Sequence, residues 1–242
     1  MIHAILFDLV GTLIEETSVF LNTPRGYYEL QVKAIHQSLE KDGISVDWSS
    51  FRDQYERIRN QQKERSRKTL REYDMCKRVS DALSFFNHNV SSASEIIAKA
   101  VDAYMNIYIK TLEIRESTYD LLKSLTAEYE LGLVTNFAYP PGAHRILDQF
   151  AMRPFFRVTL ISGEVGWKKP SPHIFEIALS RLSVKPENAA FVGDDYEADI
   201  VGAKNVGMKT VFLCKEPEYS NKADITIGSL MKLPSAVQRA HV

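Results

Sequence analysis

Short apolar runs alternate with amphipathic segments at the two ends of the chain. The apolar runs have no polar residue at every second position, which is typical of strands buried on both faces of a parallel sheet. They predict strands over Ile2–Asp8, Leu131–Thr135, Val158–Ser162, Ala189–Gly193, Lys209–Leu213 and Asp224–Ile227. The segments between them predict helices over Ser117–Glu128, Gly142–Phe150, Pro172–Leu182 and Ala198–Val206. Strands alternating with helices predict a doubly wound α/β fold with a parallel, Rossmann-like sheet.

The middle of the chain has a different pattern, with few glycines, no convincing strand and long helical periodicity. It predicts helices over Gly26–Asp42, Ser49–Lys68, Glu72–Phe86 and Ser91–Leu112, with Gly43 ending the first of them. We therefore predict an α/β core made of residues 1–14 and 115–242, and an inserted all-helical domain made of residues 15–114. Its place directly after the first strand suits a lid over the end of that strand.

Composition limits the classes of partner. The 242 residues are 45% hydrophobic and carry a net charge of −1, which is ordinary for a globular chain and gives no overall attraction to nucleic acid or membrane. The first apolar run is interrupted by His3 and Asp8 and has no basic residues before it, so we expect it to be neither a signal peptide nor a membrane span. The two cysteines, Cys76 and Cys214, do not indicate a disulfide framework. We expect a cytoplasmic protein of unknown oligomeric state.

One stretch departs from this balance. Residues Trp48–Arg78 hold ten Lys or Arg against five Asp or Glu. The excess could be a solvated helix face, an anion-attracting surface or a nucleic-acid patch. Because acid–base pairs such as Glu64–Lys68 recur at helical spacing and no nucleic-acid motif accompanies the charge, we favour the solvated face.

Candidate chemistry gathers at the ends of the predicted strands. The first strand ends at Asp8, followed by Gly11 and Thr12, and later strands end at Thr135-Asn136 and Gly193-Asp194. Open α/β sheets carry their chemistry at the carboxyl edge of the strands. A carboxylate held at that edge can act as a nucleophile. A Thr-Asn pair at a strand end also suits an ordinary turn, and acids there also suit helix capping.

Four segments together resemble the motifs of the haloacid dehalogenase-like hydrolase superfamily. Asp8-Leu9-Val10-Gly11-Thr12 is similar to its first motif, DxDGT, and differs only at Val10. The other three segments match in order: Leu133–Asn136, Gly166–Pro172 followed by Phe175, and Phe191–Asp199. The resemblance covers the predicted core at both ends of the chain. In that superfamily, helices inserted after the first motif are called a cap domain.

The resemblance implies a role for each motif residue. Asp8 would be the nucleophile, and Lys169, more than its neighbour Lys168, would offset the negative charge of the reacting groups. A transferred phosphoryl group would be bound by Thr12, Thr135 and Asn136. A magnesium ion would be held by the carboxylates of Asp8 and Asp194 and by the backbone carbonyl of Val10, with Asp195 and Asp199 in support. Carboxylates are the oxygen ligands that magnesium prefers.

Val10 stands where the superfamily usually has a second acid. That acid normally protonates the leaving group and then activates water, help that is worth about 10²–10⁴ in rate. We therefore expect a magnesium-dependent hydrolase of a small phosphorylated metabolite that is slow on alkyl phosphates and better on aryl or acyl phosphates.

Other functions remain open at this point. A dehalogenase would use Asp8 without metal, but the resemblance implies that such enzymes lack the acids of the fourth motif. A phosphonate-cleaving enzyme would need a cap lysine, for which only Lys33 and Lys41 are candidates. Loss of the acid at Val10 also fits a binding or scaffold protein that has lost catalysis. An anionic substrate could be contacted by Arg25, Tyr28, Arg65, Arg71 and Tyr73. Residues of these types are more often exposed to solvent without a ligand.

Overall fold

The computed structural model describes residues 1–17, 22–214 and 223–239. Its contacts divide the chain into two compact units. Unit 1 comprises Met1–Glu15, Ile114–Phe137 and Leu147–Val242, and unit 2 comprises Glu16–Glu113 and Ala138–Ile146. The domain limits drawn from the sequence stay predictions.

Unit 1 is built on a six-stranded sheet in which every neighbouring pair of strands is parallel. The strands lie in the order β5-β4-β1-β6-β7-β8. Their bounds are Ala4–Phe7 (β1), Glu130–Thr135 (β4), Val158–Ile161 (β5), Ala189–Gly193 (β6), Lys209–Leu213 (β7) and Ile225–Ile227 (β8). The predicted doubly wound α/β fold is confirmed, because all six predicted strands are present.

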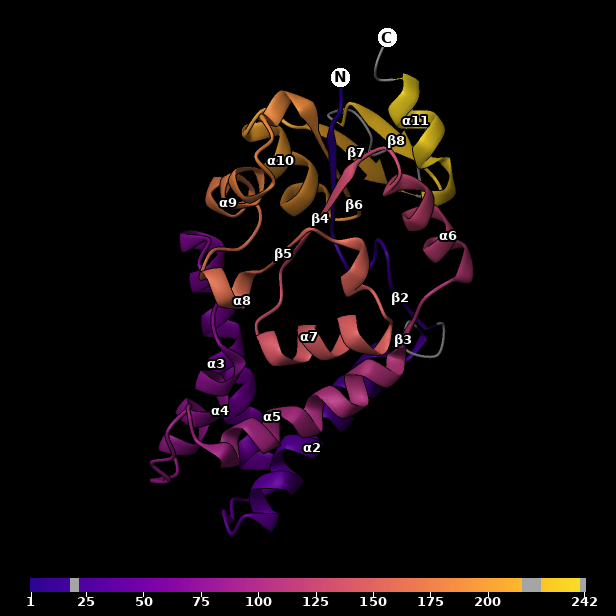
Figure 1. Ribbon diagram of the computed structural model, residues 1–242. Coiled ribbons are helices and arrows are strands. Elements are labelled where there is room, and N and C mark those ends of the chain that lie inside the picture. Colours follow the sequence, from indigo (N-terminus) through magenta and orange to yellow (C-terminus); the bar gives the residue numbers. More distant parts are fainter. Residues whose placement is uncertain (18–21, 215–222, 240–242) are drawn as a thin grey trace. The chain divides into compact units, whose positions relative to one another are not determined.

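Helices cover both faces of this sheet (Figure 1). On one face lie α9 (Pro172–Leu182) and α10 (Gly202–Asn205), and on the other lie α6 (Glu116–Leu125) and α11 (Leu233–Arg239). The α9 face is an apolar core in which Phe175 packs against Phe191, with ring centroids 5.2 Å apart. Burial on both faces explains why the strands are continuously apolar.

Several helical elements of unit 1 differ from the prediction, and α11 was not predicted. The helix predicted over Ala198–Val206 begins earlier, as a π-helix over Tyr196–Val201, and continues as α10. A short helix, α8 (Ser162–Val165), follows β5 where no helix is predicted. Short turns of 3₁₀-helix occur at Arg153–Phe155, Pro186–Asn188 and Leu230–Lys232. Single helical turns are too short to produce a periodic sequence signal, so they were missed.

The prediction of no strand between residues 15 and 112 is wrong at both limits of that segment. Two-residue strands, β2 (Glu15–Glu16) and β3 (Leu112–Glu113), pair where the chain leaves and re-enters unit 1. Strands of two residues are set by the tertiary context and not by local propensity. The side chain of Arg115 then forms an ion pair with Glu15 at 2.8 Å.

Unit 2 is helical. Its long elements are α2 (Pro24–Lys41), α3 (Trp48–Thr69), α4 (Met75–Ser84) and α5 (Glu95–Tyr108), followed by a 3₁₀ turn at Ile109–Thr111. All four predicted helices are present. The predicted starts at Glu72 and Ser91 are too early, because the side chains of Asp74 and Ser94 accept backbone hydrogen bonds and begin α4 and α5. Gly43, at φ +83°, follows the end of α2 as predicted.

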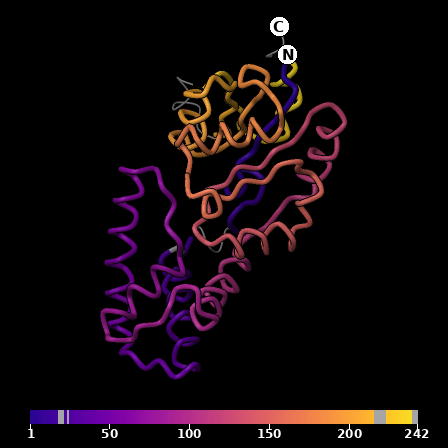
Figure 2. Tube along the Cα trace, turned by 60° about the vertical axis from the view of Figure 1, so that its left-hand side comes forward, coloured from indigo at the N-terminus to yellow at the C-terminus, as the bar shows by residue number. Residues whose placement is uncertain are grey.

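Helix α7 (Pro140–Gln149) is shared between the units, since Ala138–Ile146 groups with the helices of unit 2. Within unit 2, Tyr139 donates a hydrogen bond to Asp102 of α5 at 3.1 Å, and Arg145 forms an ion pair with the same carboxylate at 3.3 Å. The predicted core, residues 115–242, includes this segment, and a local sequence pattern carries no information on its contacts with α5. Figure 2 follows the chain trace through α7 from a second direction.

Among the residues that the structure describes, no helix is both long enough and apolar enough to span a membrane.

Candidate active site

The carboxyl edge of the sheet gathers the first and fourth motifs. Phe7 of β1 lies level with Leu133 of β4 and with Val192 of β6. The backbone N–H of Asp8 continues this ladder by donating to the Val192 carbonyl at 3.0 Å. Strand order reverses beside β1, because β4 and β5 lie on one side and β6 on the other. Residues that follow these strands therefore emerge together at the usual ligand-binding edge of an open sheet.

Two glycines allow the backbone to approach the acids closely. A Cβ atom on Gly11, which has φ +97°, would lie 2.3 Å from Oδ2 of Asp194. A Cβ atom on Gly193 would lie 2.2 Å from Oδ2 of Asp199. Only a residue without a side chain leaves room for these carboxylates, and at Gly11 the positive φ also favours glycine.

A buried lysine joins two of the acids. The ammonium Nζ of Lys169 lies 2.6 Å from Oδ1 of Asp8 and 2.6 Å from Oδ1 of Asp199. The Lys169 side chain is 2% exposed and that of Asp199 is 1% exposed. A buried charge is tolerated only when it is paired and hydrogen-bonded, so each group depends on the others. Lys169, and not Lys168, therefore reaches Asp8.

The acids resist ionisation in this setting. Burial raises the pKa of Asp8, and the charge of Lys169 opposes that effect. Burial likewise raises the pKa of Asp199 to about 6, again against the influence of Lys169. Burial also raises the pKa of Asp194, although this residue reaches the surface. For Lys169, the charges of Asp199 and Asp8 outweigh the effect of burial and raise the pKa.

Asn136 holds the backbone on which Lys169 is carried. Its side-chain Nδ2 donates to the Lys169 carbonyl at 3.0 Å, and its Oδ1 accepts from the Lys169 N–H at 2.8 Å. The amide thus binds both polar groups of one residue and fixes the loop before α9. We expected Asn136 to bind a transferred phosphoryl group, so the contact of its side chain with Lys169 was missed. A Thr-Asn pair after a strand gives no local signal of such a distant partner.

The other residues predicted for the site also lie at or near the strand ends. Thr12 donates its hydroxyl to Oδ1 of Asp194 at 2.7 Å. Thr135 is buried at the last position of β4. The carboxylate of Asp195 accepts from the N–H of Ala198 at 2.9 Å and so caps the π-helix. Val10 lies in the loop after Asp8, and the role of its carbonyl stays a prediction.

A residue outside the motifs supports the second strand end. The buried hydroxyl of Ser162, at the start of α8, accepts a hydrogen bond from the N–H of Phe137 at 2.8 Å. The carbonyl of Phe137 accepts in turn from the N–H of Gly163 at 3.2 Å. These bonds fix the loop after Asn136, and a lone serine after an apolar run did not indicate them.

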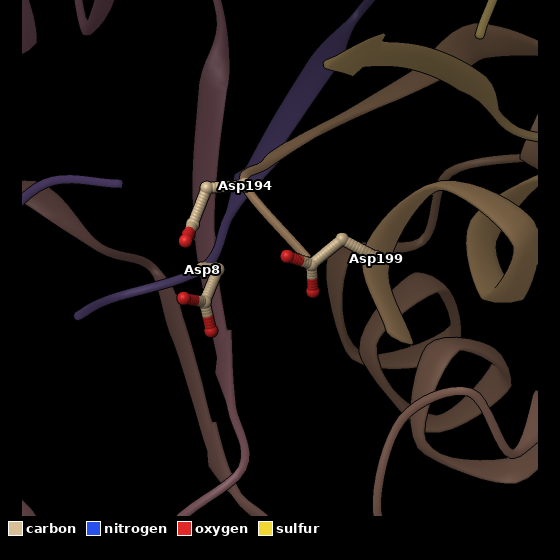
Figure 3. A group of neighbouring side chains, drawn as sticks. All are labelled: Asp8, Asp194 and Asp199. Atoms are coloured by element: carbon tan, nitrogen blue, oxygen red, sulfur yellow. The ribbon is translucent and has the colours of Figure 1, made fainter. Parts of the chain in front are cut away.

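The three carboxylates fit a metal ion. Asp8, Asp194 and Asp199 each offer an oxygen, and these oxygens lie within 4.8 Å of one another (Figure 3). Figure 3 shows Asp8 and Asp194 at adjacent strand ends, with Asp199 facing them from the next helical turn. The two oxygens of Asp199 are occupied by Lys169 and by the N–H of Asp195 at 3.0 Å. Asp8 and Asp194 are therefore the better ligands for a hard cation.

A scan against protein-family models matches residues 2–207 to the haloacid dehalogenase-like hydrolases. A glyceraldehyde 3-phosphate phosphatase of Pyrococcus abyssi is 32% identical over 213 residues, which are 88% of this chain and 81% of that protein. The same-named enzyme of Pyrococcus furiosus is 37% identical over 150 residues, which cover 59% of this chain and 62% of the relative's length.

Solved structures agree on the fold. A 2-haloacid dehalogenase of Pseudomonas syringae pv. Tomato superposes with a TM-score of 0.70 and covers 99% of this chain and 100% of its own. At 20% sequence identity this likeness concerns the fold alone.

Proposed function

Because the chain belongs to the haloacid dehalogenase-like hydrolase family, we propose that it is a magnesium-dependent phosphatase of a small phosphorylated metabolite, with Asp8 as the nucleophile. The observation that carries this proposal is the charge imbalance at the strand ends. Three carboxylates lie within 4.8 Å of one another, and the ammonium of Lys169 contacts two of them. A divalent cation and an anionic substrate would complete this arrangement.

In the first half-reaction, one carboxylate oxygen of Asp8 attacks phosphorus. An O–P bond forms while the bond from phosphorus to the leaving oxygen breaks, which gives an aspartyl-phosphate and releases an alkoxide that takes its proton from water. Lys169, held by Asp199 and Asn136, offsets the negative charge of the attacking carboxylate and the phosphoryl group. Thr12, Thr135 and Asn136 are proposed to bind the phosphoryl oxygens from their positions at the carboxyl edge of the sheet.

In the second half-reaction, water cleaves the aspartyl-phosphate and restores Asp8. Neither half-reaction has help with proton transfer at position 10. The Val10 side chain can neither donate a proton to a leaving alkoxide nor accept one from water. We therefore propose slow turnover of alkyl phosphates and faster turnover of aryl or acyl phosphates, whose leaving groups need no proton.

Magnesium, when bound by Asp8, Asp194 and the Val10 carbonyl, would supply positive charge to the phosphoryl oxygens. The substrate class is supported by the relatives, whose names specify the phosphate ester of a three-carbon sugar. Unit 2 is proposed to act as the cap that selects among such esters.

The test is a screen of phosphorylated metabolites and haloacids, each with magnesium and with a chelator. We expect phosphate release that requires magnesium and that falls about 10⁴-fold or more in Asp8→Asn, as for loss of a catalytic nucleophile. Asp120→Asn, on the exposed side of α6, is the matched control and should keep full activity. Halide release that resists the chelator would make the protein a dehalogenase, and no release of either product would favour a binding protein.

A further inference from the structure

Unit 2 holds a guanidinium without a counter-ion. Arg78, at the start of α4, is partly buried and donates to Oε1 of Gln62 at 2.9 Å and to the hydroxyl of Tyr55 at 3.4 Å. Both acceptors are neutral, and no carboxylate in the part of the chain that the structure describes forms an ion pair with Arg78. A charge removed from water without a partner is costly, so this site calls for an anion.

Two further cations of α3 lie close to Arg78. The guanidinium of Arg59 lies 4.4 Å from the ring centre of Tyr28, and its Nη1 lies 3.4 Å from Oε2 of Glu56. Burial and the charges of Arg59 and Arg78 lower the pKa of Lys63. Glu56 is an acid beside this group, and Arg59 already forms an ion pair with it. The basic cluster, defined as Arg59, Lys63 and Arg78, therefore keeps an excess of positive charge.

One polar atom beside the cluster lacks a partner. Nε2 of Gln31 is buried and makes no hydrogen bond, while the buried hydroxyl of Tyr28 lies next to the Glu56 carboxylate. Gln31 is 2% exposed and lies one turn beyond Tyr28 on the same face of α2. Burial raises the pKa of Tyr28, so its hydroxyl remains a donor. Because buried polar atoms in native proteins are nearly all hydrogen-bonded, an unpaired amide donor beside an excess of positive charge indicates a missing ligand.

The other basic residues of this stretch behave differently. Arg52 pairs with Asp53, Lys68 with Glu64 and Lys77 with Asp81, at distances of 2.6–2.8 Å. These residues form the solvated helix face expected from the sequence. The basic cluster differs in Arg78, which is partly buried and contacts only neutral acceptors.

We propose that the basic cluster, with the Tyr28 hydroxyl and the Gln31 amide, forms a binding site for a small oxyanion, the phosphate or carboxylate group of a metabolite. Guanidinium and amide donors match the oxygens of either group. Helices α3 and α4 pack against each other (Figure 1). Tyr28 of α2 contacts Arg59 of the cluster from a third helix. The site lies wholly within unit 2 and does not depend on the proposed reaction at Asp8.

The experiment is a calorimetric titration of the full chain with inorganic phosphate and, separately, with malonate, in the presence of a chelator. We expect saturable binding that Arg78→Gln and Arg59→Gln each weaken about tenfold or more, the loss of one charge-assisted hydrogen bond. Arg57→Gln is the matched control, because Arg57 lies on α3 and contacts Gln54 outside the cluster. Arg78→Lys keeps the charge and should retain most of the binding, which separates loss of charge from loss of folding. The preferred anion tells which group the site takes.

Asp8→Asn should bind both anions as the unaltered protein does. If Asp8→Asn abolishes binding, the anion sits at the strand ends and the proposal is wrong. Absence of saturable binding, or equal weakening by Arg57→Gln, would also overturn it. So would binding of an oligonucleotide by a protein that ignores both small anions, since the basic stretch would then be a nucleic-acid surface.

Discussion

The acids of unit 1 and the basic cluster of unit 2 are charged groups of opposite sign built in different ways. In unit 1, the chain brings acids to adjacent strand ends and places one lysine between Asp8 and Asp199. In unit 2, cations project from the middle of α3 and the start of α4, and Arg78 contacts only neutral acceptors. The strand ends bring together charges of opposite sign from distant segments. Neighbouring helix faces can instead bring together charges of the same sign, which a bound ion of opposite charge would neutralise.

The two units also shift the pKa values of their carboxyl groups in opposite directions. Burial raises the pKa of Asp8, Asp194 and Asp199 in unit 1. In unit 2, hydrogen bonds from the Ser49 hydroxyl and from the N–H and hydroxyl of Ser50 lower the pKa of Asp47 to about 2. Removing water raises the cost of the charge, while donors at a helix N-terminus stabilise it.

The largest expected effect concerns the proton-carrying acid that is absent at Val10 of unit 1. Val10→Asp would add a proton carrier beside Asp8, and we expect magnesium-dependent turnover of an alkyl phosphate to rise about 10²–10⁴-fold. Val10→Asn has the same shape without the acid and should not reproduce the gain. Steady-state phosphate release measures both variants. An unchanged rate in Val10→Asp, or an equal rise in Val10→Asn, would show that proton transfer does not limit turnover.

The next effect tests how unit 1 holds its buried cation. Asp199→Asn removes one of the two carboxylates around Lys169, and we expect the free energy of unfolding in urea to fall by about 3 kcal/mol. Arg78→Gln in unit 2 removes a guanidinium that is bound only to neutral acceptors, so its cost should stay below about 1.5 kcal/mol. Equal losses would contradict the contrast between a paired and an unpaired buried charge.

The smallest effect concerns the first turn of α3. Asp47→Ala should lower the melting temperature at neutral pH, because the Asp47 carboxylate accepts the N–H of Ser50 at 2.9 Å. A pKa below the unfolded value of 3.8 means that the cap stabilises the protein above that pH. The benefit is lost as the pH falls through about 2. Thermal melts from pH 7 downward should therefore converge for the two proteins, whereas Asp53→Ala, further along α3, should change little at any pH.

The sheet and the acids were predictable because strand ends carry local signals. Each apolar run stops at a polar residue, and parallel strands bring those residues to one edge, so Asp8, Thr135 and Asp194 could be placed together in advance. The side-chain role of Asn136 could not be predicted, since it depends on Lys169, a residue 33 positions away. The basic cluster could not be predicted either. Helical periodicity shows that Arg59 and Lys63 share a face of α3, but it does not show which residues pack against that face. The π-helix at Tyr196–Val201 escaped because its pattern is shorter than any window that reveals a period.

The central position of β1 has a consequence for synthesis on the ribosome. β1 is made first, yet its partners are β4, beginning at Glu130, and β6, beginning at Ala189. The bond between Asp8 and Lys169 spans 161 positions. A nascent chain therefore carries an apolar strand with two open edges until most of the protein has emerged, while the helices of unit 2 can already form from neighbouring residues. The Asp8 carboxylate is therefore synthesised early and gains its contact with Lys169 late.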